Sequence, residues 1–276
     1  QTLPFDQFIE ELETDMQRAR GSHAIGHDAE SAMLVSASSR SRFEQEERLV
    51  ELTELASSAG VTVIDRIAQR TPDGHQRYLL GSGKLKDVLI QTLHKGADMV
   101  IFDQTLTPAQ SRAISEMTDI KVIDRTQLIL DIFARRAHSR EGKVQVELAQ
   151  LRYLLPRLSG KGTELSRLGG GIGSRGPGET KLETDRRRIR DRVLHLEREL
   201  QHFARHQDQR RARRTRHRMP VLSLVGYTNA GKSTLLNVLT KSHVSTQDRV
   251  FETLDTTSRR LRFPKEREVI VTDTVG

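Results

Sequence analysis

The chain has 276 residues, of which 35% are hydrophobic and 30% charged, and it carries a formal net charge of +8. No apolar run reaches the roughly 18 residues of a membrane helix and no secretory leader opens the chain, so we expect a cytoplasmic protein without a membrane span. The absence of cysteine excludes disulfides, cysteine-ligated zinc and thiol catalysis. An aromatic content of 4% and the lack of tryptophan argue against base-stacking platforms for single-stranded nucleic acid.

The first 125 residues predict an extension, residues 1–30, followed by an α/β subdomain, residues 31–125. Apolar residues from Phe5 to Met16 have helical spacing within the extension. Strands and amphipathic helices then alternate, which is typical of a parallel sheet with helices on its faces. The expected strands are Ala32–Ser36, Val61–Ile67, Tyr78–Leu80, Ala97–Asp103 and Lys121–Asp124. The expected helices are Phe43–Ala59, Gly83–Lys95 and Pro108–Met117.

Residues 126–218 predict a helical hairpin. Periodicity indicates helices over Thr126–Ala137, Lys143–Leu158 and from Thr180 to about Arg216, and Pro156 is expected to end or kink the second. Eight glycines lie in Gly160–Gly178, which joins the two long helices. Thirteen arginines and only four acidic residues lie from Arg186 to Arg218, so the basicity is concentrated in this segment. An acidic partner would bind there.

A complete phosphate-binding motif lies in the last segment, residues 219–276. Gly226-Tyr227-Thr228-Asn229-Ala230-Gly231-Lys232-Ser233, followed by Thr234, matches G-x-x-x-x-G-K-[ST] between a strand, Pro220–Val225, and a helix, Lys232–Lys241. Backbone N–H groups close around phosphates in such a loop, the lysine reaches the β and γ phosphates, and the Ser233 hydroxyl binds Mg²⁺. An ordinary glycine turn is the alternative. Further strands are expected at Leu261–Phe263 and Glu268–Thr272.

Two further segments are expected to complete the nucleotide site. Asp273-Thr274-Val275-Gly276 follows a strand, so its carboxylate could hold Mg²⁺ through water and its glycine amide could sense the γ-phosphate. A plain boundary between strand and turn is the alternative. The polar segment Val244–Ser258 has the composition of a switch loop, and Thr253, Thr256 and Thr257 each offer a hydroxyl to the metal. Chemistry alone does not choose among these threonines.

With these motifs the sequence resembles the HflX family of translational GTPases. The P-loop and Asp273–Gly276 carry this resemblance together with Phe251-Glu252-Thr253-Leu254-Asp255, and so does the more distinctive glycine-rich segment Gly170–Arg187. Three shorter segments are similar to the N-terminal region of the family: Val122–Thr126, Leu130–Phe133 and Val146–Arg152. The resemblance runs from about Ala32 to Gly276.

The resemblance implies a cytoplasmic GTPase that binds GTP or GDP with Mg²⁺ and associates with the ribosomal RNA of the large ribosomal subunit. Such proteins split or rescue ribosomes under stress, and we expect a monomer. The implied architecture is an α/β subdomain and a helical hairpin that reaches into ribosomal RNA, followed by the first half of a P-loop GTPase domain. In the family pattern Thr253 is the threonine that binds Mg²⁺, with Ser233 and Asp273, and it acts with Lys232 in catalysis.

Departures from the family pattern concern the switch loop and the end of the chain. Glu252 and Thr256–Ser258 replace residues common in the family, and they remove no ligand. The Asn-Lys-x-Asp element that reads guanine is absent, so guanine specificity is implied only by the resemblance, and we expect the native protein to continue beyond Gly276. Asn229, three residues before the lysine, is similar to an asparagine that supports K⁺ in some related GTPases; an asparagine tolerating a turn is the alternative.

The glycine-rich loop and the start of the arginine-rich helix predict an RNA-binding surface, because glycine allows close approach and arginine pairs with phosphate. The candidate contacts are Lys161, Arg167, Arg175, Lys181, Arg186, Arg187 and Arg188. The alternatives are a flexible linker, and a solvated helix face with i,i+4 pairs to Glu197 and Glu199. Binding through phosphates predicts strong salt dependence.

Two weaker sites and two other functions complete the hypotheses. Gly81-Ser82-Gly83-Lys84 opens a helix and could bind an anion, but it lacks the spacing of a P-loop, which favours a plain turn between strand and helix. His202 and His206 have the i,i+4 spacing of a metal pair but lie in a cationic segment without an evident third ligand. The other functions are a nucleotide-independent RNA-binding module and an ATP-driven RNA-remodelling enzyme. The first would be identified by a ribosome affinity that Lys232→Ala leaves unchanged. The second would be identified by a preference of the full-length protein for ATP over GTP.

Overall fold

The computed structural model describes residues 30–71, 77–158, 177–216, 220–226, 231–240, 258–262 and 268–273. The chain divides into two compact units, with the boundary between Arg125 and Thr126. The helix expected between Phe5 and Met16 lies outside the described residues. The division of the chain into an extension, a subdomain, a hairpin and a GTPase segment stays a prediction.

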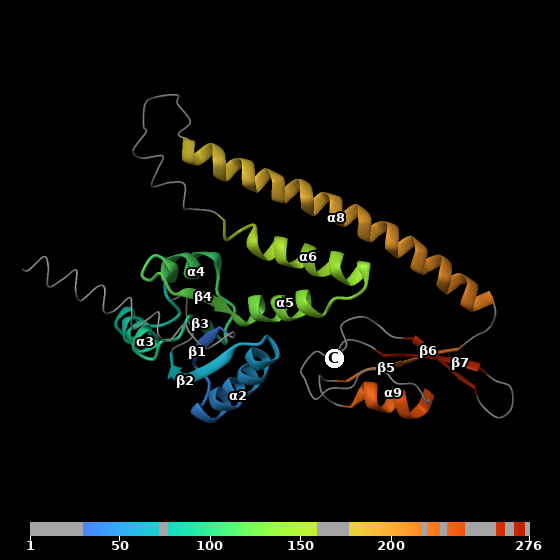
Figure 1. The fold of residues 1–276 in the computed structure, drawn as a ribbon, viewed down its shortest axis with the longest axis horizontal. Helices are drawn as coiled ribbons and strands as arrows, with labels where there is room; N and C mark the ends of the chain where they lie inside the picture. Colours follow the sequence, from blue (N-terminus) through green and yellow to red (C-terminus); the bar gives the residue numbers. More distant parts are fainter. Residues whose placement is uncertain are drawn as a thin grey trace, which may run out of the picture. The chain divides into compact units, whose positions relative to one another are not determined.

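The first unit contains a four-stranded sheet, in which β1 (Ser31–Ser38) and β3 (Met99–Phe102) are the inner strands, flanked by β2 (Thr62–Arg70) and β4 (Lys121–Asp124). All three strand pairs are parallel, in the order β2-β1-β3-β4. Nearly every side chain of β1 and β3 is buried, as expected when helices cover both faces of a parallel sheet (Figure 1). The expectation of an α/β fold with a parallel sheet is confirmed.

The helices of this unit are α2 (Arg42–Ser58), α3 (Ser82–His94) and α4 (Pro108–Ser115). Capping boxes begin two of them: the N-cap side chain accepts a hydrogen bond from the N3 backbone, and the N3 side chain accepts one from the N-cap backbone. These boxes pair Ser41 with Glu44 in α2, and Thr107 with Gln110 in α4.

The strand expected over Tyr78–Leu80 is wrong. The two end residues form an isolated antiparallel bridge, and Leu79 between them has a φ of 65°. That left-handed conformation turns the chain back on itself, so the segment cannot extend as a strand.

The hydrophobic core of this unit fills the space between the inner strands, α3 and α4. Burial of a large apolar side chain stabilises the fold by about 1.5–3 kcal/mol relative to leaving it exposed to water. Its largest members are Met33, Leu80, Leu85, Phe102, Leu106 and Ile114.

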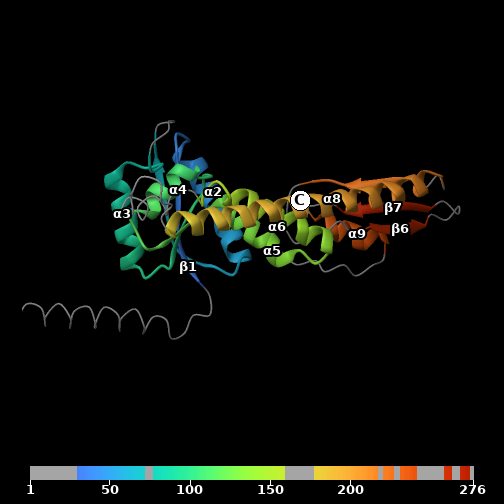
Figure 2. The same cartoon turned by 90° about the horizontal axis from the view of Figure 1, so that it is seen from above.

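The second unit contains α5 (Arg125–Arg136, from Thr126 onward), α6 (Arg140–Leu154) and the 40-residue α8 (Pro177–Arg216). Figures 1 and 2 show α6 alongside part of α8. The α6 helix ends at Leu154, earlier than predicted, although Leu155 keeps a helical conformation and bonds the Leu151 carbonyl. Pro156, the next residue, has no N–H group to continue the helical hydrogen bonds. The α8 helix begins three residues earlier than predicted, with a proline in the first turn, where that residue is tolerated.

An apolar seam joins α6 and α8. Val144 and Leu148 pack against Leu196, which is fully buried. Other α8 residues at the seam are Val193, Leu200 and Phe203. Together with Leu196 they are spaced three, four and three residues apart, as in a coiled coil. The two helices are antiparallel, since Arg140 of α6 bonds Glu199 of α8, whereas Glu147, later in α6, bonds Arg192, earlier in α8.

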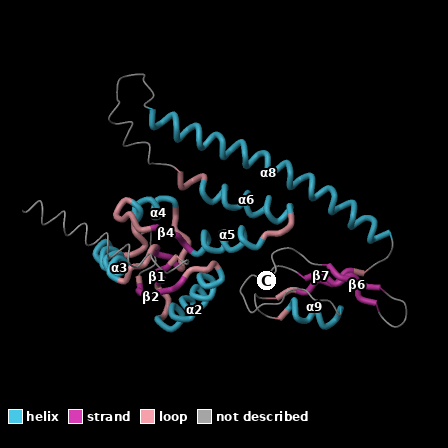
Figure 3. The backbone as a smooth tube through the Cα atoms, viewed as in Figure 1, coloured by secondary structure: helices cyan, strands magenta, loops and turns pink. Residues whose placement is uncertain are grey.

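The last part of the chain forms a three-stranded sheet with one helix. Its strands are β5 (Val221–Leu224), β6 (Ser258–Arg262) and β7 (Glu268–Asp273), and the helix is α9 (Lys232–Thr240). The order is β5-β7-β6, with β5 and β7 parallel and β6 antiparallel to β7. Figure 3 shows β6 and β7 in magenta with α9 in cyan. Ser258 lies in β6 rather than at the end of the predicted switch loop. Among the described helices, none is long and apolar enough to cross a membrane.

Candidate functional site

The P-loop motif and the predicted Mg²⁺ aspartate lie at the same edge of the second sheet. β5 ends at Leu224, the exposed Gly226 follows two residues later, and α9 begins at Lys232. The parallel register pairs Leu224 with Asp273, the last residue of β7. Parallel strands end at a common edge, so two motifs more than forty residues apart are brought side by side. Ligands of open α/β sheets bind at such carboxyl edges.

The described part of the P-loop has the backbone that its glycine and lysine require. The Lys232 ammonium donates a hydrogen bond to the Gly226 carbonyl oxygen at 2.9 Å, which draws this side chain back over the loop. Gly231 has a φ of +76°, a left-handed conformation that strains other residues. An added Cβ would meet no atom within 4 Å. Conformation, rather than lack of space, therefore calls for glycine at this position.

Only some of the predicted nucleotide-site residues are described. The backbone places Ser233 and Thr234 in the first turn of α9 and Asp273 at the end of β7. The other candidates, including Asn229 and Thr253, lie outside the described residues, in Tyr227–Ala230, Phe251–Asp255 and Thr274–Gly276. Their roles stay predictions.

Two glutamates of α8, Glu197 and Glu199, form ion pairs with α6. Glu197 accepts a hydrogen bond from Arg152 at 2.6 Å, and Glu199 from Arg140 at 2.8 Å. The alternative of i,i+4 pairing inside α8 is therefore wrong for these two glutamates. The reason is geometric, because both side chains flank the seam. The charges of these two glutamates are thus neutralised by α6 rather than by arginines of α8.

Arg192 and Glu147 form a further interhelical pair, with nitrogen–oxygen distances of 2.7 and 2.9 Å. The hydrogen bond from Arg192 lowers the pKa of Glu147 and raises the pKa of Arg192. This two-point contact fixes the register of the hairpin.

The predicted RNA contacts have different surroundings. Arg187 and Arg188 are exposed on α8, and Arg188 lies 3.7 Å from Asp185. Arg186 is partly buried, and its Nε is shielded from solvent without a hydrogen-bond partner among the described residues. Lys181 lies in α8, whereas the other three candidates lie outside the described residues: Lys161, Arg167 and Arg175.

The two weaker candidates acquire no further ligands. His202 and His206 are exposed, with 3.3 Å between their Nε2 atoms, and no group of three potential metal ligands occurs in the described ranges. Gly81 is the N-cap of α3 and makes no side-chain cap, and its carbonyl accepts the N–H of Leu85. The arrangement is that of a turn between β2 and α3.

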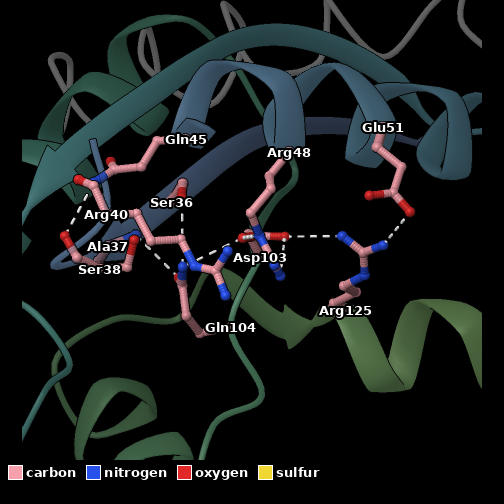
Figure 4. A network of polar contacts seen from close by, with 10 residues as sticks. All are labelled: Ser36, Ala37, Ser38, Arg40, Gln45, Arg48, Glu51, Asp103, Gln104 and Arg125. Carbon is pink, nitrogen blue, oxygen red and sulfur yellow. Dashed lines mark hydrogen bonds and ion pairs between the residues drawn. The ribbon is translucent and has the colours of Figure 1, made fainter. Parts of the chain in front are cut away.

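Sequence reasoning did not single out a buried carboxylate at the carboxyl edge of the first sheet. Asp103 follows β3, and its side chain is 0% exposed. It accepts hydrogen bonds from Arg48 Nε at 2.7 Å and Arg125 Nη1 at 3.0 Å (Figure 4). Arg125 also pairs with Glu51, and Gln104 bonds both Asp103 and the backbone N–H of β1. The hydrogen bond to Asp103 raises the pKa of Arg48. The one available signal was an aspartate directly after an apolar strand.

Three family models match consecutive parts of the chain. They are described as GTP-binding GTPase N-terminal, over residues 46–134, GTP-binding GTPase Middle Region, over residues 136–214, and 50S ribosome-binding GTPase, over residues 221–276. A solved GTP-binding protein of the hyperthermophilic archaeon Sulfolobus solfataricus, in complex with GDP, has 23% sequence identity and a TM-score of 0.44. That match covers 90% of this chain and 61% of the archaeal one.

Curated relatives are much closer in sequence. The GTPase HflX of Caldanaerobacter subterraneus subsp. tengcongensis is 50% identical over 252 residues, which cover 91% of this chain and 58% of that protein. The GTPase HflX of Escherichia coli (strain K12) is 47% identical over 230 residues, which cover 83% of this chain and 54% of that protein. The chain thus spans little more than half the length of these relatives. With the N-terminal, middle and GTPase regions matched in order at this level of identity, the chain belongs to the HflX family.

Proposed function

We propose that the full-length protein binds and hydrolyses GTP, and that it acts in the cytoplasm on the large ribosomal subunit to split or rescue ribosomes under stress. One observation carries the nucleotide part of this proposal: the register that pairs Leu224 with Asp273 beside the P-loop. The family model over residues 221–276 is described as a 50S ribosome-binding GTPase, which supports the choice of partner.

Lys232 is the cation that would meet the nucleotide. One of its acceptors is the neutral Gly226 carbonyl, whereas the β and γ phosphates would offer charged oxygens and stronger hydrogen bonds. The N-terminus of α9 adds partial positive charge at the same place. During attack of water on the γ-phosphate, Lys232 and the loop amides would stabilise the developing charge, and the products are GDP and phosphate.

The donor set at this edge fits Mg²⁺. A serine is the second residue of α9 and an aspartate ends the neighbouring β7. Hydroxyl and carboxylate oxygens are ligands that this ion prefers. Ser233, Asp273 and Thr253 would hold it, and the bound ion would neutralise charge on the β and γ phosphates. Asn229 would support K⁺, and hydrolysis at equal rates in K⁺ and Na⁺ would contradict that role.

The hairpin is the proposed RNA-binding part. The arginines Arg187, Arg190, Arg198 and Arg205 are exposed on α8, while Glu197 and Glu199 are neutralised by α6. An excess of exposed guanidinium groups along one helix suits the phosphate backbone of ribosomal RNA. Binding of this kind weakens steeply as salt concentration rises.

Co-sedimentation of the full-length protein with purified large ribosomal subunits tests the proposal. The arms are a non-hydrolysable GTP analogue, GDP and no nucleotide, each at two salt concentrations. Tighter pelleting with the analogue than with GDP is expected, and Lys232→Ala should abolish that difference. Lys86→Ala, which removes an exposed lysine of α3, is the matched control. The protein should preserve its nucleotide response in that control.

Other outcomes favour the competing functions. Pelleting that is unaffected by nucleotide and by Lys232→Ala would indicate a nucleotide-independent RNA-binding module. Tighter pelleting with an ATP analogue than with a GTP analogue would indicate an ATP-driven enzyme. No pelleting at low salt would overturn the ribosomal partner.

A further inference from the structure

The outer face of α2 carries an exposed stripe of apolar and acidic side chains. Phe43 is 70% exposed and Val50 is 49% exposed, while Glu47 and Glu54 are exposed between and beyond them. The spacing of four, three and four residues places all four side chains on one side of the helix. We call Phe43, Glu47, Val50 and Glu54 the α2 stripe.

The α2 stripe takes no part in the fold of the first unit. The buried residues of the helix lie on the opposite side and pack on β1 and β2: Gln45, Leu49, Leu52, Leu55 and Ala56. The polar side chains Gln45 and Arg48 turn toward the sheet edge, where they bond backbone carbonyls and Asp103 (Figure 4). A Phe side chain that remains exposed to this degree loses the free energy that its burial would bring, so the fold does not explain it.

The charge of the α2 stripe is uncompensated. Arg42 pairs with Glu46 at 3.0 Å, and Glu44 is used in the capping box. Glu47 and Glu54, in contrast, form no ion pair within the described part of the chain. Two free carboxylates next to two exposed apolar side chains would repel a phosphate backbone and attract lysine or arginine.

We propose that the α2 stripe is the docking surface for a basic amphipathic helix of a protein of the large ribosomal subunit. Apolar side chains of that helix would contact Phe43 and Val50, and its lysines or arginines would pair with Glu47 and Glu54. The stripe runs from Phe43 to Glu54, or about 16 Å at 1.5 Å per residue, which matches three turns of a partner helix. The identity of the particle rests on the proposed function, whereas the chemistry of the partner rests on the stripe.

Charge argues against two other occupants. Residues 1–17 of this chain contain five acidic residues and no lysine or arginine, so they would be repelled by Glu47 and Glu54. Ribosomal RNA would be repelled for the same reason, in contrast to its attraction to the α8 arginines.

Site-specific photo-crosslinking tests the proposal. The full-length protein with p-benzoylphenylalanine in place of Phe43 is bound to purified large subunits with a non-hydrolysable GTP analogue and irradiated. The matched control carries the same group in place of Ile90, a 51% exposed residue of α3 outside the stripe. We expect the Phe43 variant alone to give an adduct with a subunit protein, through a peptide rich in lysine or arginine. Glu47→Lys with Glu54→Lys should lower the yield at least about fivefold without loss of pelleting.

The outcomes separate this proposal from the proposed function. If the variants pellet with the subunit, adducts with ribosomal RNA, with the same chain or with a second copy overturn the docking surface and leave the ribosomal function intact. The same holds for no adduct, or for equal yields from the Phe43 and Ile90 variants. If neither variant pellets, the ribosomal function itself fails, and the partner assigned to the α2 stripe fails with it.

Discussion

The two sheets of this chain each place an aspartate at the carboxyl edge of a strand with a parallel neighbour: Asp103 after β3 and Asp273 at the end of β7. At the first edge the carboxylate is fully buried and bonded to Arg48 and Arg125. At the second edge the nearby cation is Lys232, and it is bonded to the neutral carbonyl of Gly226.

This comparison shows why position in the fold does not by itself define a ligand site. At the first edge the protein supplies both charges, so their interaction stabilises the fold. At the second edge Lys232 donates a hydrogen bond to a neutral carbonyl, and in the function proposed above a phosphate would take the place of this acceptor. The identity and burial of the neighbouring groups therefore separate a structural edge from a binding edge.

The largest expected effect is that of Asp103→Ala. The change leaves Arg48 and Arg125, whose side chains are 33% and 20% exposed, without their buried partner. Breaking a buried pair in this way costs about 3–5 kcal/mol. Hydrogen exchange of the β1 and β3 amides should show a decrease of that size in the free energy of opening. Glu51→Ala, which removes a 54% exposed partner of Arg125, should cost no more than about 1 kcal/mol. Equal effects of the two changes would remove the contrast between the edges.

Lys232→Ala should have the next largest effect, on GTP affinity and not on stability. A hydrogen bond to a charged group contributes about 1.5–3 kcal/mol, so the Kd for GTP of the full-length protein should rise about 10- to 100-fold. Titration calorimetry measures this change, and thermal unfolding without nucleotide should be almost unaffected. An unchanged Kd would mean that the second edge, like the first, has a structural role only.

Gly231→Ala should lower GTP affinity at the second edge through strain in the backbone. The left-handed backbone makes alanine unfavourable by about 1–2 kcal/mol, although the added methyl meets no atom within 4 Å. A loss of GTP affinity larger than this strain would mean that the phosphates occupy the open space beside Gly231. A Kd that rises no more than about 30-fold would leave backbone strain as the whole explanation.

The second edge could be predicted from the sequence and the first could not, for physical reasons. The P-loop was predictable because its chemistry is contained in eight consecutive residues, and the alternating elements because burial on a sheet imposes local periodicity. The Asp103 cluster was not predictable, since its arginines lie 55 and 22 residues away and only the fold brings them together. The same applies to Glu197, which bonds Arg152 of another helix. The wrong strand at Tyr78–Leu80 depended on one left-handed residue, Leu79, which periodicity does not reveal.

The smallest expected effect concerns the opposite end of the same strand. Asp98 precedes β3 at the amino edge of the first sheet, and it accepts hydrogen bonds from the Ser31 hydroxyl at 2.6 Å and the Ser31 backbone N–H at 2.8 Å. These bonds, the hydroxyl one first, lower the pKa of Asp98 below its usual value of about 3.9. Carbon-detected NMR of the aspartate carboxyl groups between about pH 2 and 6 would measure this pKa.

The sign of the pH dependence follows from that direction. A carboxyl group with a lowered folded-state pKa stabilises the fold above its unfolded value, and this contribution is lost as the pH falls through the lowered pKa. Ser31→Ala removes the hydroxyl but keeps the backbone donor, so the pKa of Asp98 should rise only part of the way to its usual value. A pKa that does not change in this variant would mean that the backbone N–H alone holds the carboxylate.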